Sequence, residues 1–203
     1  RGPFRADHVG SLLRPERLHN ARKSYKEGTI THEQLREVET EEIKRIVDKQ
    51  IEIGLKAVTD GEFRRSWWHL DFMEHFQGVE GYVPDYGYKF QGVETEKYDV
   101  RTVGKVSFNQ DHPFIKDFVE FNEIVAGRAV AKLTVPSPNQ FFNKGIRNLE
   151  IYPDIEEYAT DIIQAYREAL SAFYEAGVRY LQFDDVYIAG LSAPTIPFGE
   201  ENE

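Results

Sequence analysis

The feature that most constrains the fold of this chain is an order of segments that occurs three times. Each time, a helix-like segment ends near a glycine, a short apolar run follows, and the run ends in polar or acidic side chains. The three apolar runs are residues 55–58, 129–135 and 178–183. Alternation of helices with short apolar strands predicts an α/β fold with a parallel sheet. Because ligands bind at the carboxyl ends of such strands, the polar clusters predict one pocket.

The helical segments carry recognisable start signals. The first begins with Thr31 and Gln34, which have the spacing of a capping box. The second begins with Pro113, a residue that fits the first turn of a helix. The third begins after Asp154, which has Glu157 three residues on. Each segment carries an apolar stripe at helical spacing, so we expect three amphipathic helices.

Two further segments complete the expected organisation. A strand is expected at residues 4–9, which gives four strands in all. At about residues 79–108 the pattern changes to glycine and tyrosine alternation, which predicts an inserted hairpin or lid. A closed barrel of strands and helices needs eight strands, so a chain with four is expected to be cut short. A small, open, four-stranded sheet is the alternative.

Composition excludes several classes of partner. The formal net charge of −10, from 35 acidic and 25 basic residues, opposes binding to nucleic acid and to anionic membranes. No apolar stretch approaches the roughly 20 residues that a membrane span needs. The chain has no cysteine, so it offers neither a disulfide nor a thiolate ligand for a metal. We expect a cytoplasmic protein with no nucleic-acid or membrane partner, for which oligomerisation stays open.

Acidic residues at the predicted strand ends are the candidates for chemistry. Glu62 follows the first apolar run, and Arg64 lies two residues further on. A carboxylate there can hold an ammonium group, and a guanidinium can hold a carboxylate or phosphate. Asp184 and Asp185 follow the third run and point to opposite faces if the strand continues, so one of them enters the pocket. The structural alternative is that Asp60 caps the following helix while the arginines neutralise neighbouring acids, and that Asp184 and Asp185 form a turn with a helix cap.

Among the histidines, only His8 is placed at the end of a predicted strand. The spacing of the other histidines does not resemble the pair of a zinc-binding helix. No glycine-rich pattern for a nucleotide is present, so the sequence does not support a nucleotide cofactor.

Three motifs together carry a family resemblance: residues 8–11 (HVGS), 59–65 (TDGEFRR) and 181–185 (LQFDD). They resemble the catalytic domain of cobalamin-independent methionine synthase, and in particular its shorter, single-barrel bacterial members. The resemblance implies a (β/α)8 TIM barrel of the methionine synthase type. This chain would cover about the first four βα units, with residues 1–203 as the N-terminal part of one barrel domain. It also implies methyl transfer from 5-methyltetrahydrofolate, in its polyglutamate form, to the zinc-bound thiol of homocysteine, giving methionine.

The resemblance assigns roles to particular residues. Glu62 resembles the glutamate that contacts homocysteine, and Asp184 resembles the aspartate that receives the ammonium group of homocysteine. Gly10 and Ser11 resemble the segment that holds the homocysteine carboxylate through backbone and hydroxyl donors. Glu62 and Asp184 are the catalytic candidates. The further substrate-binding candidates are His8, Gly10, Ser11, Arg64 and Asp185. The folate-binding candidates are Asn139 and Gln140.

The resemblance also implies zinc as a cofactor. In the family, its ligands are a His-x-Cys pair, a glutamate and a second cysteine, all in the second half of the barrel. This chain has no cysteine, and no metal ligand is assigned in it. The missing half of the barrel is expected to supply the metal site.

Two other functions stay open at this point. One is a barrel glycoside hydrolase that uses Glu62 with Asp184 or Asp185 as acid and base, with aromatic residues, 13% of the chain, as sugar platforms. The other is a non-catalytic half-barrel that only binds an amino acid or pairs with a second chain through its open sheet edges.

Overall fold

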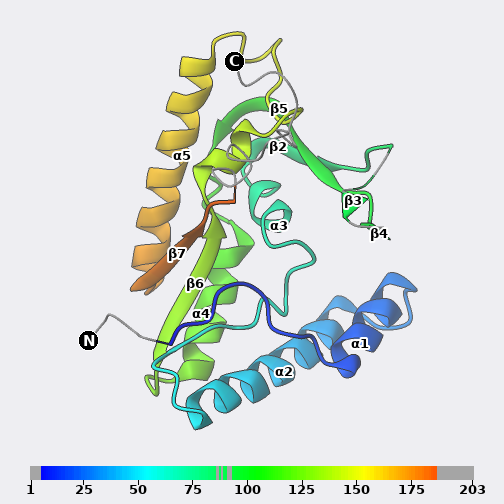
Figure 1. Ribbon diagram of the computed structural model, residues 1–203, viewed down its shortest axis with the longest axis vertical. Coiled ribbons are helices and arrows are strands. Elements are labelled where there is room, and N and C mark those ends of the chain that lie inside the picture. The colour runs from blue at the N-terminus through cyan, green and yellow to red at the C-terminus, as the bar shows by residue number, and fades with distance from the viewer. Residues whose placement is uncertain (1–5, 86, 88, 91–92, 187–203) are drawn as a thin grey trace. The chain divides into compact units, whose positions relative to one another are not determined.

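The computed structural model describes residues 6–85, 87, 89–90 and 93–186 (Figure 1). The chain divides into two compact units. The first unit consists of residues 1–68, 116–134 and 174–182, and the second consists of residues 69–115, 135–173 and 183–203. Both units are therefore built from segments that lie far apart in the sequence.

The first unit begins with two helices that precede a short strand, namely α1 (Glu16–Lys26), α2 (His32–Glu52) and β1 (Ala57–Val58). The capping box predicted at the start of α2 is confirmed. The Thr31 hydroxyl accepts a hydrogen bond from the Gln34 N–H at 3.3 Å, and the Gln34 side chain accepts one from the Thr31 N–H at 2.8 Å. Helix α1 was not expected from the sequence. Its Leu18 is fully buried, as are Ile43 and Val47 of α2.

Four longer elements each run from one unit into the other, namely α4 (Pro113–Val125), β6 (Val130–Pro136), α5 (Ile155–Glu175) and β7 (Tyr180–Asp184). The predicted helix starts are confirmed, because α4 begins at Pro113 and the Asp154 carboxylate accepts the Glu156 N–H at 2.9 Å. Strands β1, β6 and β7 form one sheet in that order. Strands β1 and β6 are parallel, with Ala57 opposite Val130. The predicted α/β fold with a parallel sheet is thus present.

The second unit holds a short helix, a set of small strands and a 3-10 helix, namely α3 (Leu70–Met73), β2 (Gln77–Tyr82), β3 (Lys89–Phe90), β4 (Val93–Glu94), β5 (Asp99–Ser107) and η1 (Pro138–Phe142). Strands β2 and β5 pair antiparallel across the region where a hairpin insertion is expected, and β3 pairs with β4. The β2–β5 ladder shifts register between Gln77 and Val79. Gly78 lies at this shift with a φ of +77°, a conformation that glycine adopts without a Cβ penalty.

The strand expected at residues 4–9 is wrong for the part that the structure describes. Residues 6–9 carry no strand, and the sheet that holds the parallel pair β1 and β6 has three strands among the described residues. The backbone of this segment is bound by a side chain and not by a neighbouring strand, because the Lys132 ammonium donates to the His8 carbonyl at 2.7 Å. Val9, an apolar residue of this segment, is 64% exposed, so the segment has no buried face of the kind that a strand in the sheet would have.

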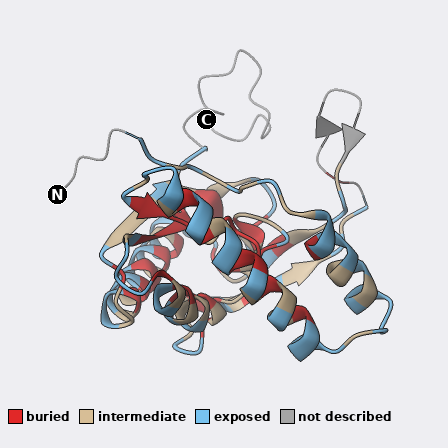
Figure 2. Cartoon of the chain, turned by 90° about the horizontal axis from the view of Figure 1, so that it is seen from below, coloured by how far each residue is buried: buried red, intermediate tan, exposed pale blue. Residues whose placement is uncertain are grey.

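An aromatic cluster forms the core of the second unit. Phe72 lies edge-to-face with Phe76 at a centroid distance of 5.2 Å, and the His112 ring stacks on Phe108 at 5.7 Å. The His112 Nε2 lies 2.9 Å from the Phe72 carbonyl, which satisfies the buried ring. Buried residues follow one side of the longer helices and exposed residues the other (Figure 2). Among the helices of the described residues, none is both long and apolar enough to cross a membrane.

A buried histidine makes the stability of the second unit depend on pH. Burial lowers the pKa of His69 to about 4 from a usual value of 6.5. Between these two values the unfolded chain binds a proton that the folded chain does not, so stability falls as the pH falls. We expect the free energy of unfolding in urea to drop by roughly 2 kcal/mol from this group between pH 7 and pH 5.

The control for this prediction is His69→Gln, a variant of similar size without a titrating ring. Between pH 7 and pH 5, its free energy of unfolding is expected to drop by about 2 kcal/mol less than that of the unaltered protein. An equal pH dependence in both proteins would contradict the assignment to His69.

Candidate functional site

The turn after β1 is fixed by hydrogen bonds from both sides. Gln50 of α2 donates to the Thr59 carbonyl at 2.8 Å and accepts the Thr59 N–H at 3.0 Å. The Gly61 N–H donates to the Thr59 hydroxyl at 3.2 Å, and the Glu62 N–H donates to the Asp60 carboxylate at 2.9 Å. Asp60 therefore caps the turn and not a helix, and the turn fixes the position of Glu62.

Glu62 has an unusual backbone. Its φ is +59°, and the only other described non-glycine residue with a positive φ is Ala126. For a residue with a side chain this left-handed conformation costs roughly 1–2 kcal/mol. Such strain persists where the surrounding structure enforces it and is common at functional sites. The strain at Glu62 favours a functional role for its carboxylate.

The Glu62 carboxylate is buried but compensated. The residue is 2% exposed. Its Oε1 accepts a hydrogen bond from the Thr134 hydroxyl at 3.3 Å and lies 3.8 Å from Nη1 of Arg65. Arg65 in turn donates to the Thr134 carbonyl at 2.7 Å. The ends of β1 and β6 in the first unit therefore share one polar cluster, which we call the Glu62 cluster: Glu62, Arg65 and Thr134.

The segment with the HVGS motif lies against the same turn. The Leu12 N–H donates to the Gly61 carbonyl at 3.1 Å, and Arg14 donates to the carbonyls of Glu62 and Arg65 at 3.1 and 2.9 Å. A Cβ on Gly61 would lie 2.9 Å from the Phe63 ring and 3.3 Å from the Leu12 Cβ, so glycine is required for this approach. The structure thus brings the segment with predicted Gly10 and Ser11 to the Glu62 turn.

The predicted residues of that segment differ in exposure. Gly10 has a φ of +79° with open space around it, and Ser11 is exposed. The Nε2 of His8 is buried and has no hydrogen-bond partner among the described residues. Successive backbone N–H groups in a turn with a left-handed residue can form a concavity that binds an anion. Gly10 and Ser11 therefore stay candidates for holding a carboxylate.

Arg64 is held by the protein itself. Its side chain is 4% exposed and lies 3.3 Å from Glu39 and 2.9 Å from Glu120. It also donates to the Thr40 hydroxyl at 3.1 Å. Burial raises the pKa of Glu39 and outweighs the opposing effect of the neighbouring arginines. Arg64 thus links α2 to α4, and its predicted role as a substrate contact stays a prediction.

The second unit holds the other predicted residues. The Ser137 N–H donates to the Asp184 carbonyl at 2.9 Å, and Asn139 donates to the Asp185 carboxylate at 2.8 Å. The Ser137 hydroxyl accepts the Asn139 N–H at 3.3 Å, which caps η1. The structure thus brings together the polar clusters that follow the second and third apolar runs.

Gln140 is the least satisfied of these residues. It is 2% exposed, and its Oε1 accepts a hydrogen bond from Asn143 at 3.1 Å. Its Nε2 is buried without a hydrogen-bond partner among the described residues. A buried donor without a partner is costly and calls for an explanation, of which a bound ligand is one.

The alternative in which arginines neutralise neighbouring acids holds for Arg65, which lies 3.8 Å from the Glu62 carboxylate. Sequence reasoning missed other residues that shape the site, namely Thr134, Lys132, Asp7 and Tyr180. Lys132 carried a signal, because it is the one charged residue within the second apolar run. Thr134 and Tyr180 had no comparable signal, since both residue types are ordinary in strands.

The residues in hand do not fit a zinc site. Among the described residues there is no group of three or more histidines or acids that could hold a metal ion. The sequence has no cysteine.

Comparisons with known proteins place these features in context. The sequence pattern of a family described as "Cobalamin-independent synthase, Catalytic domain" matches residues 4–103. The uncharacterized protein YxjH of Bacillus subtilis is 51% identical over 185 residues, which cover 91% of this chain and 48% of YxjH. The methionine synthase of Sulfurisphaera tokodaii is 25% identical over 87% of this chain and 50% of its own length. The chain spans about half the length of these curated relatives.

Solved structures agree with the observed fold. A putative vitamin-B12 independent methionine synthase from Listeria monocytogenes superimposes with a TM-score of 0.83 and 43% sequence identity, over 98% of this chain and 57% of that chain. A B12-independent methionine synthase from Shewanella, solved with selenomethionine, has a TM-score of 0.58 at 21% identity. The second likeness shows the fold alone. The α/β fold of this chain is therefore similar to that of B12-independent methionine synthases.

The strained backbone of Glu62 yields a stability prediction. We expect Glu62→Gly to be at least as stable as Glu62→Ala, by up to about 1 kcal/mol, because glycine adopts a positive φ without a Cβ penalty. Both variants lose the carboxylate, so the comparison isolates the backbone. The measurement is the free energy of unfolding in urea.

Glu37, exposed within α2, provides the matched control. There Glu37→Gly should be about 1 kcal/mol less stable than Glu37→Ala, because glycine weakens a helix interior. The same loss at both positions would contradict strain at Glu62.

Proposed function

Because the chain belongs to the cobalamin-independent methionine synthase family, we propose that it carries the amino-acid-binding part of a methyltransferase. The proposed reaction moves a methyl group from 5-methyltetrahydrofolate, in its polyglutamate form, to the thiol of homocysteine and gives methionine. The observation that carries the proposal is the buried, strained Glu62, fixed at a strand end beside the Gly10–Ser11 turn. The activity is proposed for the whole protein, since this chain spans about half the length of relatives such as YxjH and YxjG.

The residue types suit a zwitterionic amino acid. Carboxylates hold an ammonium group through charge-assisted hydrogen bonds, and we assign this role to Asp184, with Glu62 as a second contact to homocysteine. Gly10 and Ser11 offer backbone and hydroxyl donors for the carboxylate. His8, Arg64 and Asp185 are kept as further substrate-binding candidates. Of these, Arg64 has the weakest support because it is buried among carboxylates.

The folate side of the proposal rests on Asn139 and Gln140. The buried Gln140 Nε2 needs an acceptor, and a pterin ring carries carbonyl and ring-nitrogen acceptors. Asn139 already binds Asp185, so its contribution would be indirect.

The transfer itself is a displacement. The sulfur of homocysteine forms a bond to the methyl carbon, the bond from that carbon to N5 of the folate breaks, and N5 keeps the electron pair and takes up a proton. A thiol with a pKa near 8.5 is mostly protonated at neutral pH, so its deprotonation is part of the reaction. No residue of this chain is assigned to that step. Zinc remains an expectation from the family, with ligands outside this chain.

Other parts of the proposal follow from the family. We propose that the three parallel strands belong to a (β/α)8 barrel, in a cytoplasmic protein whose oligomeric state is open. Several relatives, at 24–28% identity, are named methionine synthase or homocysteine methyltransferase, and no observation in the structure favours the glycoside hydrolase alternative. A half-barrel that only binds an amino acid is a second outcome of the test below.

The test compares two thiols by isothermal titration calorimetry. Asp184→Ala should weaken homocysteine binding by about tenfold or more, because a hydrogen bond to a charged group contributes roughly 1.5–3 kcal/mol. Binding of 4-mercaptobutanoate, which lacks the amino group, should change much less. Equal losses for the two thiols would remove the role assigned to Asp184.

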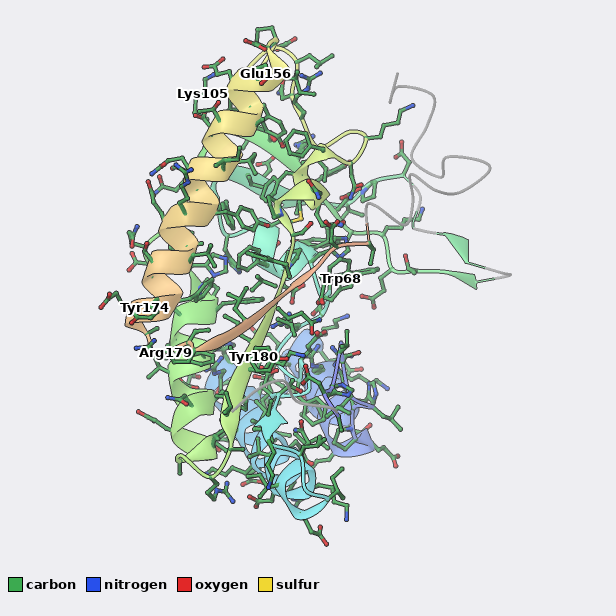
Figure 3. The ribbon with its side chains drawn as sticks, turned by 60° about the vertical axis from the view of Figure 1, so that its left-hand side comes forward. Trp68, Lys105, Glu156, Tyr174, Arg179 and Tyr180 are labelled. Atoms are coloured by element: carbon green, nitrogen blue, oxygen red, sulfur yellow. The ribbon has the colours of Figure 1, made fainter. Side chains whose placement is uncertain are left out.

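Glu156→Ala serves as the control, because Glu156 is an exposed acid of the same unit at the start of α5 (Figure 3). It should leave both affinities unchanged. Failure of the unaltered protein to bind homocysteine would contradict the proposed function. Binding of homocysteine without methyl transfer by the protein would favour the non-catalytic alternative.

A further inference from the structure

We infer that Lys132 is a positioning residue, whose buried ammonium anchors residues 7–8 and thereby fixes the Gly10–Ser11 turn. The inference concerns the first unit alone. Its consequence for ligand binding rests on the proposed function, whereas its consequence for the order of the segment does not.

The ammonium of Lys132 is fully enclosed. Its side chain is 0% exposed, and Nζ lies 2.7 Å from the Asp7 carboxylate and 2.7 Å from the His8 carbonyl. The Tyr180 ring centroid lies 5.1 Å from the same nitrogen. An ammonium has three donors, and two of them bind neighbouring residues of one segment. Lys132 therefore holds both the side chain of residue 7 and the backbone of residue 8.

A second donor strengthens the anchor. Tyr180 lies at the start of β7 (Figure 3). Its hydroxyl donates to the same oxygen of Asp7 at 2.5 Å. Burial raises the pKa of Asp7, but the hydrogen bonds from Lys132 and Tyr180 and the charge of Lys132 outweigh it and hold the pKa below its usual value. Asp7 is thus ionised at neutral pH. The three residues form what we call the Lys132 anchor: Lys132, Asp7 and Tyr180.

The anchor and the Glu62 cluster share a strand. Lys132 and Thr134 are two residues apart in β6, so their side chains point to the same face. Thr134 binds Glu62, and Lys132 binds residues 7–8. The segment is held again at Leu12, through the Gly61 carbonyl. Residues 9–11 lie between these two fixed points, with open space around Gly10, so the anchors determine their place.

Stability alone is a weak reason for a buried lysine. Burying an ion pair costs desolvation energy that its attraction barely offsets, and an apolar residue of similar size often serves as well. Lys132 makes two hydrogen bonds to residues 7–8, and we infer that its role is to fix the position of that segment. The neighbours Ala131 and Leu133 of the same strand are apolar and buried, so strand packing itself does not need the charge.

The first test is amide hydrogen exchange on Lys132→Met, which keeps an unbranched side chain, one atom shorter, and removes the charge. Peptides covering residues 7–12 should exchange about tenfold faster or more, because the local opening of the segment loses its anchor. Peptides of α2 should exchange as before. Unchanged exchange at residues 7–12, or an equal rise throughout the protein, would overturn the inference.

The second test asks what the anchor does for a ligand. If the turn holds a carboxylate, Lys132→Met should weaken homocysteine and 4-mercaptobutanoate alike, and 3-aminopropanethiol, which lacks the carboxylate, should bind as before. This pattern is the reverse of that expected for Asp184→Ala. Lys132→Arg, which keeps the charge, should recover part of the lost affinity. Equal weakening of all three thiols, or no recovery with arginine, would mark Lys132 as merely structural.

Further variants keep the inference testable if Lys132→Met does not fold. Asp7→Ala removes the carboxylate, which is only 21% exposed, and leaves the bond from Lys132 to His8. It should raise exchange at residues 7–12, and unchanged exchange would overturn the inference. Tyr180→Phe, which keeps the ring, should have the smaller effect. If the unaltered protein binds none of the thiols, the proposed function fails, while the exchange experiment still decides the role of Lys132.

Discussion

The first unit depends on the compensation of one buried carboxylate. Glu62 is out of contact with water, and an isolated charge in such a place would be too costly to keep. Arg65 and the Thr134 hydroxyl supply a positive charge and a donor. Because Arg65 also binds the Thr134 carbonyl, the same interaction that neutralises the acid joins the turn after β1 to strand β6. The position of the Glu62 carboxylate and the contact between the turn and β6 therefore both depend on Arg65.

The order of elements was accessible from the sequence because each element carries its own local signal. The capping box at Thr31 and Gln34 and the proline at the start of α4 act within a few residues, and both are present as expected. Helix α1 was missed because most of its residues are polar and only Leu18 among them is buried. The strand expected at residues 4–9 is absent over the described residues 6–9, because a short apolar run cannot show whether a neighbouring strand is available for pairing. The Lys132 ammonium, far away in sequence, donates to the His8 carbonyl there.

In the candidate site, too, some residues could be predicted from the sequence and others could not. Glu62 and Asp184 could be named from their places after apolar runs, and the family resemblance agreed. Their surroundings could not be predicted, because the contacts of Glu62 with Thr134 and of Asp7 with Lys132 join residues 72 and 125 positions apart. For Arg64 the structure adds contacts that the sequence did not indicate, and its role as a substrate contact stays a prediction. Its sequence neighbourhood suggests a ligand contact, whereas its guanidinium lies among Glu39, Glu120 and Thr40.

The two polar side chains of β6 also bear on how the sheet assembles. A slip of one residue in a strand exchanges its two faces. In β6 such a slip would place the ammonium of Lys132 where Ala131 or Leu133 now packs, and an aliphatic side chain opposite the Glu62 carboxylate. Both exchanges would leave a charge without its partner. The buried polar side chains of β6 thus destabilise a shifted register relative to the native one. They favour the native alignment of the sheet during folding, before any ligand is present.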